Sequence, residues 1–440
     1  MKLMSLKSMI WMFSRFLLGV LFLLGAGTYV QVQTQQANAD ELNPTIQLPE
    51  FKLISPDRVA TLSGDEQRSW NEYLKRSEVY SIQERQVLAD EIKQAGLSAS
   101  RLAPANRKEF ELGSKVDEKW LSLPETTLLA NTILSYQTPT GGWSKAIDYS
   151  RGPRAVGTHW TGQSGSGWHY CGTLDNRSTT EQIRFLAYLH RINQDAKFID
   201  GAHRGLQWLL DAQFPNGGWP QVYPLESGYH EAITLNDGAM LHAVQLLLEV
   251  GDGKIPFEWV EASLRTKSKE AAMKGIQCLL RVQVVLDGKP TVWCAQHDPL
   301  TLAPVAARLK EPVSLSGGES ADLVKFLMRE APDSKEMRIA ISAAVEWFEA
   351  RKIVGLKKSK NESGKTDYIL DASSNEVLWA RFYDIETQQP IFAGGQDGIL
   401  YSSYGEMAKH NKVGYDYFTS RPNEIITKEV ERWKKRIHGQ

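Results

Sequence analysis

Two short acidic stretches of this sequence carry oxygen-rich side chains of the kind that bind a hard cation or a sugar. Asp175 and Asn176 lie in the run TLDNRSTT, and Asp237 lies in the run LNDGA. Carboxylate and amide oxygens are the ligands that Ca²⁺ prefers. If the two runs met in the fold, Asp175 and Asp237 would form a calcium site. Hydrogen bonding to sugar hydroxyls and ordinary surface turns or helix caps are equally consistent with the residue types alone.

Two further residues have neighbours that suggest chemistry. His297 lies beside Asp298, as a general base often does, although a hydrogen-bonded structural histidine is the more common case. Arg381 lies in the apolar run WARFYD, where a guanidinium needs an anionic partner. That partner is either a nearby carboxylate, Asp384 or Glu386, or an anionic ligand.

The elements that must position these residues come from an internal repeat. GLQWLLDAQ at 205–213 recurs as GIQCLLRVQ at 275–283, and a looser copy ends at Gln137. Each copy runs into a loop that contains a tryptophan: Trp143, Trp219 and Trp293. Helix-pair repeats of this length can close into a double layer of helices. We therefore expect an all-α fold, an (α/α) barrel or toroid, with the loops at one end carrying the site.

The chain also has an N-terminal segment that lies outside the repeat. Residues 40–115 are polar and contain one strong helical candidate around 65–96, so we expect an N-terminal helical extension. The toroid is expected to span 116–430.

Residues 1–39 have the features of a signal peptide. Lys2, Lys7 and Arg15 precede an apolar run at 16–24, and the triplet ANA ends at residue 39. The protein is therefore expected to be exported, to the periplasm or the medium. The apolar run is shorter than a membrane span, so we expect no membrane association of the mature form. An uncleaved anchor is the alternative.

Charge and cysteine content bound the function further. The 440 residues include 51 Lys and Arg against 52 Asp and Glu, a balance that gives no general attraction for nucleic acid. We expect a monomer. The three cysteines, Cys171, Cys278 and Cys294, are consistent with one disulfide and a thiol or with three buried thiols. The nine histidines show no HExxH or CxxC spacing, so zinc is not predicted.

Six motifs in order resemble those of the family 10 polysaccharide lyases, which are pectate lyases. They are YQTPTGGWSK, GTLDNRSTTEQI, FPNGGWPQVYP, ITLNDGAM, WCAQHDPLTLAPVAAR and WARFYDIET. The similarity spans roughly residues 85–420. It implies an (α/α)₃ toroid, which agrees with the repeat. It also implies Ca²⁺-assisted β-elimination of polygalacturonate to 4,5-unsaturated oligogalacturonates.

The resemblance assigns catalytic roles to residues of this chain. Asp175 and Asp237 would handle calcium and substrate at the catalytic subsite, and Arg381 would occupy the position of the proton-abstracting base. An arginine, with a reference pKa of about 12.5, is a strong but sparsely populated base that alkaline pH and neighbouring cations favour. Whether Arg381 is the base or an electrostatic clamp stays open.

The resemblance also suggests which residues bind the uronate chain. These are Arg308, Asn176 and Thr180, and Trp219 is expected to offer a flat face to a sugar. One departure concerns Gln396 in the run GGQDG, where the family leads us to expect an arginine. One uronate contact would then be missing or weaker.

Two other functions are consistent with the same residues. A glycoside hydrolase acting on unsaturated uronides would use Asp175 and Asp237 as acid and base. A pectin-binding protein without turnover is the second alternative, but it would be expected to have replaced Arg381. Elimination leaves an ultraviolet-absorbing double bond and hydrolysis does not, so the products separate the two enzymes.

Overall fold

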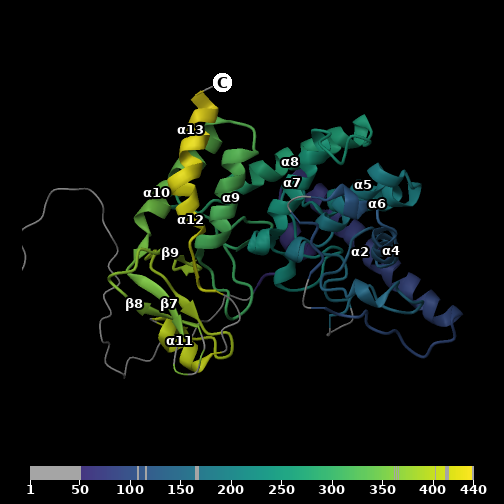
Figure 1. The fold of residues 1–440 in the computed structure, drawn as a ribbon, viewed down its shortest axis with the longest axis horizontal. Helices are drawn as coiled ribbons and strands as arrows, with labels where there is room; N and C mark the ends of the chain where they lie inside the picture. Colours follow the sequence, from purple (N-terminus) through teal and green to yellow (C-terminus); the bar gives the residue numbers. More distant parts are fainter. Residues whose placement is uncertain are drawn as a thin grey trace, which may run out of the picture.

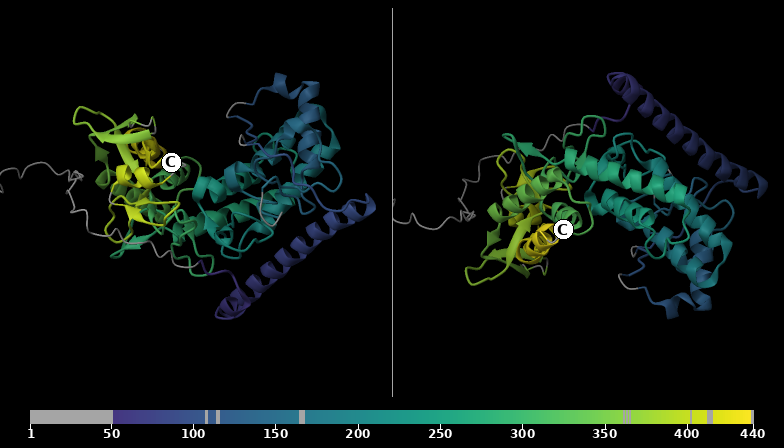
Figure 2. Two further views of the ribbon diagram at one scale, coloured as in Figure 1. Left: turned by 90° about the horizontal axis from the view of Figure 1, so that it is seen from below. Right: turned by 90° about the horizontal axis from the view of Figure 1, so that it is seen from above.

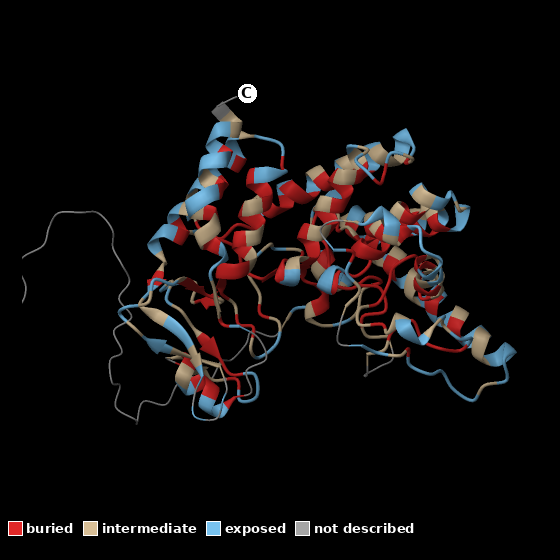
Figure 3. Cartoon of the chain, viewed as in Figure 1, coloured by how far each residue is buried: buried red, intermediate tan, exposed pale blue. Residues whose placement is uncertain are grey.

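The computed structural model describes residues 51–106, 109–113, 116–163, 168–360, 362, 364, 366–401, 403–411 and 416–438. The described chain is mainly helical, as predicted, with short strands in addition (Figure 1). Buried residues run through the helix pairs, whereas none of the residues of the hairpin formed by β7 (Leu356–Lys360) and β8 (Thr366–Leu370) is buried (Figure 3). The predicted signal peptide, 1–39, lies outside the described residues.

A long N-terminal helix lies along the outside of the helix pairs (Figure 2). This helix, α2 (Gly64–Gln94), follows the short α1 (Pro56–Val59) and confirms the helix expected around 65–96. Its Trp70 and Tyr73 are buried in the main core, each with its ring centroid 5.2 Å from that of Phe214. Aromatic packing therefore fastens this helix to the loops of the repeat.

Successive antiparallel helix pairs form the body of the molecule (Figure 1). They are α3 (Glu118–Leu121), α4 (Pro124–Ser135), α5 (Thr180–Asn193), α6 (Ala196–Ala212), α7 (Ala239–Gly251), α8 (Ala262–Arg281), α9 (Gly317–Arg329) and α10 (Lys335–Ala350). Within the series α5 packs on α6, α7 on α8, and α9 on α10. The pairs are also joined to one another, since α4 contacts α6, α5 contacts α7, and α8 contacts α10.

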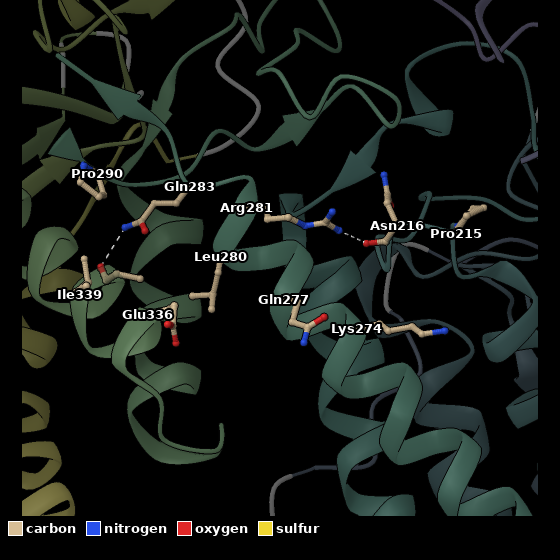
Figure 4. A pocket seen from close by; sticks show the side chains of 11 residues that line it. Pro215, Asn216, Lys274, Gln277, Leu280, Arg281, Gln283, Pro290, Glu336 and Ile339 are labelled. Carbon is tan, nitrogen blue, oxygen red and sulfur yellow. Dashed lines mark hydrogen bonds between the residues drawn. The ribbon is translucent and has the colours of Figure 1, made fainter. Parts of the chain in front are cut away.

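The glutamine that ends each copy of the repeat links the tryptophan loop that follows it to the second helix of the next pair. Each Nε2 donates to two backbone carbonyls, one in the loop and one in α6, α8 or α10. The acceptors are Gly141 and Gly201 for Gln137, Gly217 and Ala271 for Gln213, and Thr291 and Ala340 for Gln283 (Figure 4 shows the bond from Gln283 to α10). The repeat in the sequence therefore corresponds to a repeated set of hydrogen bonds in the structure.

The tryptophans of the loops are fully buried. Their Nε1 atoms donate to carbonyls near the end of the preceding helix at 2.7–2.9 Å: Trp143 to Ile133, Trp219 to Leu209, Trp293 to Leu279 and Trp379 to Phe348. Trp379 is thus a fourth copy that the sequence comparison missed. Because Trp219 is 0% exposed, the prediction that it stacks on a sugar is wrong.

The first glycine of each GGW loop allows close contact with a helix. Gly141 and Gly217 have positive φ angles of 112° and 94°, and a Cβ at either position would collide with the carbonyl of Arg204 or Lys274. Only glycine adopts this conformation without strain. These loops therefore approach the next helix closely, and their glycines have a packing role.

The C-terminal part adds short antiparallel strands that the all-α prediction did not include. Strand β9 (Val377–Ala380) pairs with β6 (Ile353–Val354) and β13 (Phe418–Thr419), and β10 (Phe382–Tyr383) pairs with β5 (Leu315–Ser316). The strands β7 (Leu356–Lys360) and β8 (Thr366–Leu370) form a hairpin. Arg381 lies between β9 and β10, where the chain changes its pairing partner.

The remaining elements are short, and they connect or close the larger ones. The strands are β1 (Ile233–Thr234), β2 (Val285–Leu286), β3 (Lys289–Pro290), β4 (Gln296–His297), β11 (Phe392–Ala393) and β12 (Leu400–Tyr401). The helices are α11 (Tyr404–His410), α12 (Arg421–Glu424) and α13 (Val430–His438). Single turns are η1 (Tyr149–Arg151), η2 (Asp175–Arg177), η3 (Tyr229–Glu231), η4 (Asn236–Gly238) and η5 (Ile425–Glu429).

Two expectations about the whole chain can be compared with the structure. Cys171, Cys278 and Cys294 are buried thiols without a disulfide, which decides between the two alternatives. Across the described ranges, every helix is too short or too polar to span a bilayer.

Candidate active site

Three acidic residues lie at the N-terminal ends of the first helices of three successive pairs, α5, α7 and α9, and the tryptophan loops hold them there. Asp175 lies in the turn before α5, Asp237 in the turn before α7, and Glu319 in the first turn of α9. The segment leading into each helix donates a backbone hydrogen bond to a loop tryptophan carbonyl: Thr173 to Trp143 at 3.0 Å, Thr234 to Trp219 at 3.2 Å, and Ser316 to Trp293 at 2.8 Å. The repeat thus presents one carboxylate per unit.

The turns η2 and η4 bring the two predicted acidic motifs into contact. The central residue of each turn has a positive φ angle, Asn176 with φ 51° and Asp237 with φ 50°, and so does the residue after it. Asparagine and aspartate tolerate this conformation better than most residues. The residue types therefore suit the backbone conformation of both turns. The packing of η2 on η4 supports the prediction that Asp175 and Asp237 lie close together.

Asp175 is buried and carries one oxygen without a protein partner. Its Oδ2 forms an ion pair with Lys145, whose ammonium lies 3.6 Å from the centroid of the Tyr170 ring. Within the described chain, Oδ1 is buried and accepts no hydrogen bond. An orphaned carboxylate oxygen is unfavourable unless a cation or a donor reaches it. Asp175 is therefore suited to a metal ligand.

Asp237 faces the same space and has a raised pKa. It is open to solvent, yet the surrounding protein removes enough water to raise its pKa, and the carboxylates of Asp175 and Glu319 raise it further. Its Oδ2 accepts a hydrogen bond of 2.8 Å from Asn236 Nδ2. A bound Ca²⁺ would relieve the repulsion between these carboxylates and would also reach the unpartnered oxygen of Asp175. The residues therefore fit the predicted calcium ion.

Arg381 reaches this acidic pair through Asn236. Its backbone is held on both sides, since its N–H donates to Tyr417 at 2.7 Å and its carbonyl accepts from Gly317 at 3.2 Å. The guanidinium Nη2 lies 3.1 Å from Asn236 Oδ1 and 3.3 Å from Glu319 Oε1. Asn236 therefore bridges Asp237 and Arg381, and the carboxylate beside Arg381 comes from α9.

A polar pocket with a volume of about 970 Å³ opens over these groups. Asn176, Asp237 and Arg381 line it together with Glu319, and Arg177 and Arg421 add further positive charge. Four of the predicted site residues, Asp175, Asn176, Asp237 and Arg381, therefore lie in or beside one cavity.

Neither Arg308 nor Gln396 lines this pocket, although Lys310, two residues after Arg308, is close enough to Arg381 and Asp237 for their charges to affect its pKa. Arg308 Nε donates to Glu311 Oε2 at 2.7 Å, and the hydrogen bonds that Arg308 donates to this buried carboxylate raise the pKa of Arg308. Lys310, two residues on, has a lowered pKa because of burial and the nearby positive charge of Arg308. Gln396 is exposed, and its neighbour Gly395 lies against the side chain of Lys310. Their roles in substrate binding stay predictions.

Two predicted site residues do not reach the pocket. Thr180 is completely buried and donates to the carbonyl of Arg177 at 2.8 Å, so the prediction that it contacts the sugar is wrong. Trp219 is excluded by its burial in the core, as described above. His297 is buried as well and its Nδ1 lies 3.1 Å from the carbonyl of Leu302, while burial lowers its pKa to about 4. It is a structural histidine.

Sequence reasoning missed Glu319 and the lysines of the site. A signal for Glu319 exists, because Ser316-Gly-Gly-Glu319 is a capping box: Ser316 caps α9 and its hydroxyl contacts the Glu319 carboxylate. Lys145 lies two residues after the tryptophan of the first GGW motif. Nothing in the local sequence marks Lys310, which the fold brings within electrostatic reach of Asp237 and Arg381.

A second pocket of about 770 Å³ lies between α8 and α10 (Figure 4). Gln283 and Arg281 line it, and Arg281 donates to the carbonyl of Asn216. None of the predicted site residues belongs to it. The acidic pocket is therefore the candidate active site.

The sequence model of the pectic acid lyase family matches residues 137–426, which include all of these site residues. The chain belongs to the pectic acid lyase family. Membership makes it a polysaccharide lyase.

Two solved structures of the family 10 polysaccharide lyase from Cellvibrio cellulosa are similar to this lyase. One is a mutant in complex with trigalacturonic acid; it is 30% identical, covers 71% of this chain and 96% of its own, and has a TM-score of 0.62. The other is the same enzyme, with 30% identity, 71% and 95% coverage, and a TM-score of 0.61. No curated protein matches the sequence significantly.

Proposed function

We propose that this lyase cleaves polygalacturonate by Ca²⁺-assisted β-elimination, with Arg381 as the base. The observation that carries the proposal is the chain of contacts from Asp237 through Asn236 to Arg381, beside the orphaned oxygen of Asp175. The trigalacturonic acid bound to the Cellvibrio relative supports a galacturonate substrate.

Asp175 and Asp237 are the residues that would hold calcium. When bound, the ion supplies positive charge next to the uronate carboxylate, which becomes more negative as the C5 proton leaves. Lys145 keeps Asp175 in its position through the ion pair at Oδ2, leaving Oδ1 for the ion. The neighbouring carboxylates that raise the pKa of Asp237 also favour binding of a cation there.

The elimination needs a base and a charge stabiliser on the substrate's C5 side. The base takes the C5 proton, the electrons form the C4–C5 double bond, the C4–O bond breaks, and the leaving oxygen takes a proton. Arg381 is proposed as the base because backbone hydrogen bonds hold it on both sides and its guanidinium contacts Asn236, next to Asp237. Arg308 and Lys310 would supply positive charge for uronate carboxylates.

Family membership favours a lyase over the glycoside hydrolase and over the non-catalytic binding protein. One observation favours the hydrolase: it needs a protonated carboxyl group, and the raised pKa of Asp237 favours the protonated form. Arg381, which a binding protein without turnover would not need, is present and ordered by backbone hydrogen bonds. The lyase therefore accounts for more of the site.

The proposal includes three wider features. The helix pairs would close as an (α/α)₃ toroid spanning 116–430, with residues 40–115 as a helical extension. The predicted signal peptide would direct export to the periplasm or medium. The enzyme would act as a monomer on the polysaccharide.

The test follows ultraviolet absorbance while the full-length enzyme acts on polygalacturonate with calcium or with excess EDTA. We expect an absorbance rise with calcium and none with EDTA. Full activity in EDTA would overturn the calcium assignment. New reducing ends without any absorbance change would instead show hydrolysis.

A further inference from the structure

Three metal-ligating side chains lie together outside the active-site pocket: His169, Glu226 and His230. One ligand atom from each lies within 4.8 Å of the others. His169 Nδ1 is 2.7 Å from Glu226 Oε1, and the two imidazole centroids are 4.7 Å apart. The residues come from two loops, one before α5 and one before α7. No sequence motif joins them, because their spacing along the chain is set by the helix pair between the loops.

His230 is the observation that distinguishes this cluster from an ordinary ion pair. It is 5% exposed, and across the described residues neither of its ring nitrogens makes a hydrogen bond. A buried polar group without a partner is costly. Burial and then the nearby His169 lower the pKa of His230 to about 3, so the ring is neutral at physiological pH, the form that binds metals.

The donor set selects the class of ion. We propose that His169, Glu226 and His230 bind a divalent transition-metal ion of the zinc class. Two imidazoles with one carboxylate form a common three-residue zinc ligand set that keeps an open position, whereas Ca²⁺ prefers oxygen ligands throughout. The backbone N–H of Tyr170 donates to Glu226 Oε2 at 3.2 Å and orients the carboxylate from outside.

The cluster has access to solvent. The side chains of His169 and Glu226 are 29% and 22% exposed, and Glu226 also lines a pocket of about 320 Å³ beside α2. An ion can therefore enter without opening the core, and a water molecule can complete its coordination.

A metal here would fasten two loops that lie next to Asp175. Tyr170 and Tyr229 are the sequence neighbours of the two histidines, and their hydroxyls are 3.1 Å apart. Lys145, which pairs with Asp175, lies over the ring of Tyr170. The ion would thus join the two loops that carry these tyrosines. The inference does not depend on the proposed role of Arg381 or of calcium.

The experiment titrates zinc chloride into chelator-treated, untagged full-length protein by calorimetry, with excess calcium chloride present to saturate oxygen-ligand sites. We expect one equivalent of zinc to bind and thermal stability to rise. Cobalt chloride in place of zinc should give the visible absorption of a site with nitrogen ligands. The variants His230→Gln, His169→Gln and Glu226→Gln should each weaken zinc binding by more than about 100-fold, because changes to outer-shell groups alone cost 10–100-fold.

His203→Gln is the matched control, since His203 lies on α6 outside the cluster, and it should bind zinc as the wild type does. Glu226→Gln keeps the test valid if a buried histidine variant does not fold, because Glu226 is partly exposed. A wild type that takes up no zinc overturns the proposal. So does zinc binding that is unchanged in the folded His169→Gln and Glu226→Gln variants.

Discussion

The guanidinium of Arg381 lies 3.3 Å from the carboxylate of Glu319, measured from Nη2 to Oε1. Both side chains are largely shielded from water, at 18% and 9% exposure. A carboxylate at this distance favours the charged guanidinium, whereas a base must be neutral. In the free enzyme Glu319 therefore opposes the role proposed for Arg381, unless calcium or substrate draws the carboxylate away.

If Arg381 is the base, kcat should rise toward alkaline pH as the guanidinium becomes neutral. Glu319→Gln should move this rise to lower pH, because it removes the negative charge that favours charged Arg381 while keeping a side chain of similar size. The measurement is kcat against pH on polygalacturonate at saturating calcium. Asp322→Asn is the control, since Asp322 lines the same pocket and pairs with Arg421. An alkaline rise at the wild-type pH would show that Glu319 does not govern the base.

Asp237→Asn should abolish activity and remove the stabilisation that calcium gives. Without metal the variant should be as stable as the wild type or slightly more so, since the repulsion that raises the pKa of Asp237 is relieved. Thermal unfolding with and without calcium measures both effects. Asp175→Ala should differ, because it leaves the mostly buried Lys145 without its carboxylate and so destabilises the metal-free protein. Calcium stabilisation that survives in Asp237→Asn would place the ion elsewhere.

The sequence predicted the acidic pair and Arg381 because their motifs are short and distinctive. It did not predict Glu319, since the pairing of β5 with β10, which brings Glu319 beside Arg381, joins segments that are far apart in the sequence. The tryptophans were misassigned for a physical reason. A tryptophan in a glycine-rich loop is equally typical of a sugar platform and of a buried anchor, and only the hydrogen bond from Nε1 to the preceding helix separates the two.

Trp219→Phe should lower the free energy of unfolding by about 2 kcal/mol, through the lost Nε1–Leu209 hydrogen bond and a small cavity. KM on polygalacturonate should stay close to that of the wild type. Urea unfolding and initial-rate kinetics provide the two measurements. Trp379→Phe, which removes the equivalent bond to Phe348, should cost a similar amount. A large rise in KM without loss of stability would restore a sugar-binding role for Trp219.

Glu84 gives the protein a predictable dependence on pH. It lies on α2, accepts a hydrogen bond of 2.6 Å from Thr140, and burial raises its pKa from 4.5 to about 7. The neutral carboxyl group therefore contributes stability that is fully present below pH 4.5 and is lost as the pH rises through about 7. Glu84→Gln mimics the neutral form. It should gain on the order of 2 kcal/mol relative to the wild type above neutral pH and little in acid.

Thermal unfolding of Glu84→Gln across this pH range is the measurement, with the exposed Glu78→Gln on the same helix as control. A difference from the wild type that does not change with pH would show that Glu84 stays ionised in the folded protein.

The fold was predictable to the level of its helix pairs, since the glutamine that ends each repeat is visible in the sequence and bonds as a repeat in the structure. The short strands near Arg381 were not, because β9 and β10 together are too short to show an alternating pattern. The cluster of His169, Glu226 and His230 was also invisible, as its members meet only after the loops are placed.

Arg381→Lys and Arg381→Ala distinguish a base from a binding clamp. If Arg381 takes the proton, both variants should lose several orders of magnitude in kcat, because a lysine lacks the forked geometry that places a nitrogen at Asn236 and Glu319. KM should change far less, since in the proposed mechanism Arg308, Lys310 and calcium would still contact the uronates. If Arg381 is a clamp, Arg381→Lys should keep most of kcat and raise KM.

The measurements are kcat and KM at saturating calcium over a range of alkaline pH. A double variant, Arg381→Ala with Glu319→Gln, adds information. Arg381→Ala alone leaves the Glu319 carboxylate buried without its cation, and Glu319→Gln removes that carboxylate. The double variant should therefore recover stability relative to Arg381→Ala, yet stay inactive if the guanidinium is the base. A kcat within about tenfold of the wild type for either Arg381→Ala protein would remove this residue from the proton transfer. Loss of kcat in Arg381→Ala that the double variant reverses would instead mean that unpaired Glu319, and not the missing base, had blocked the reaction.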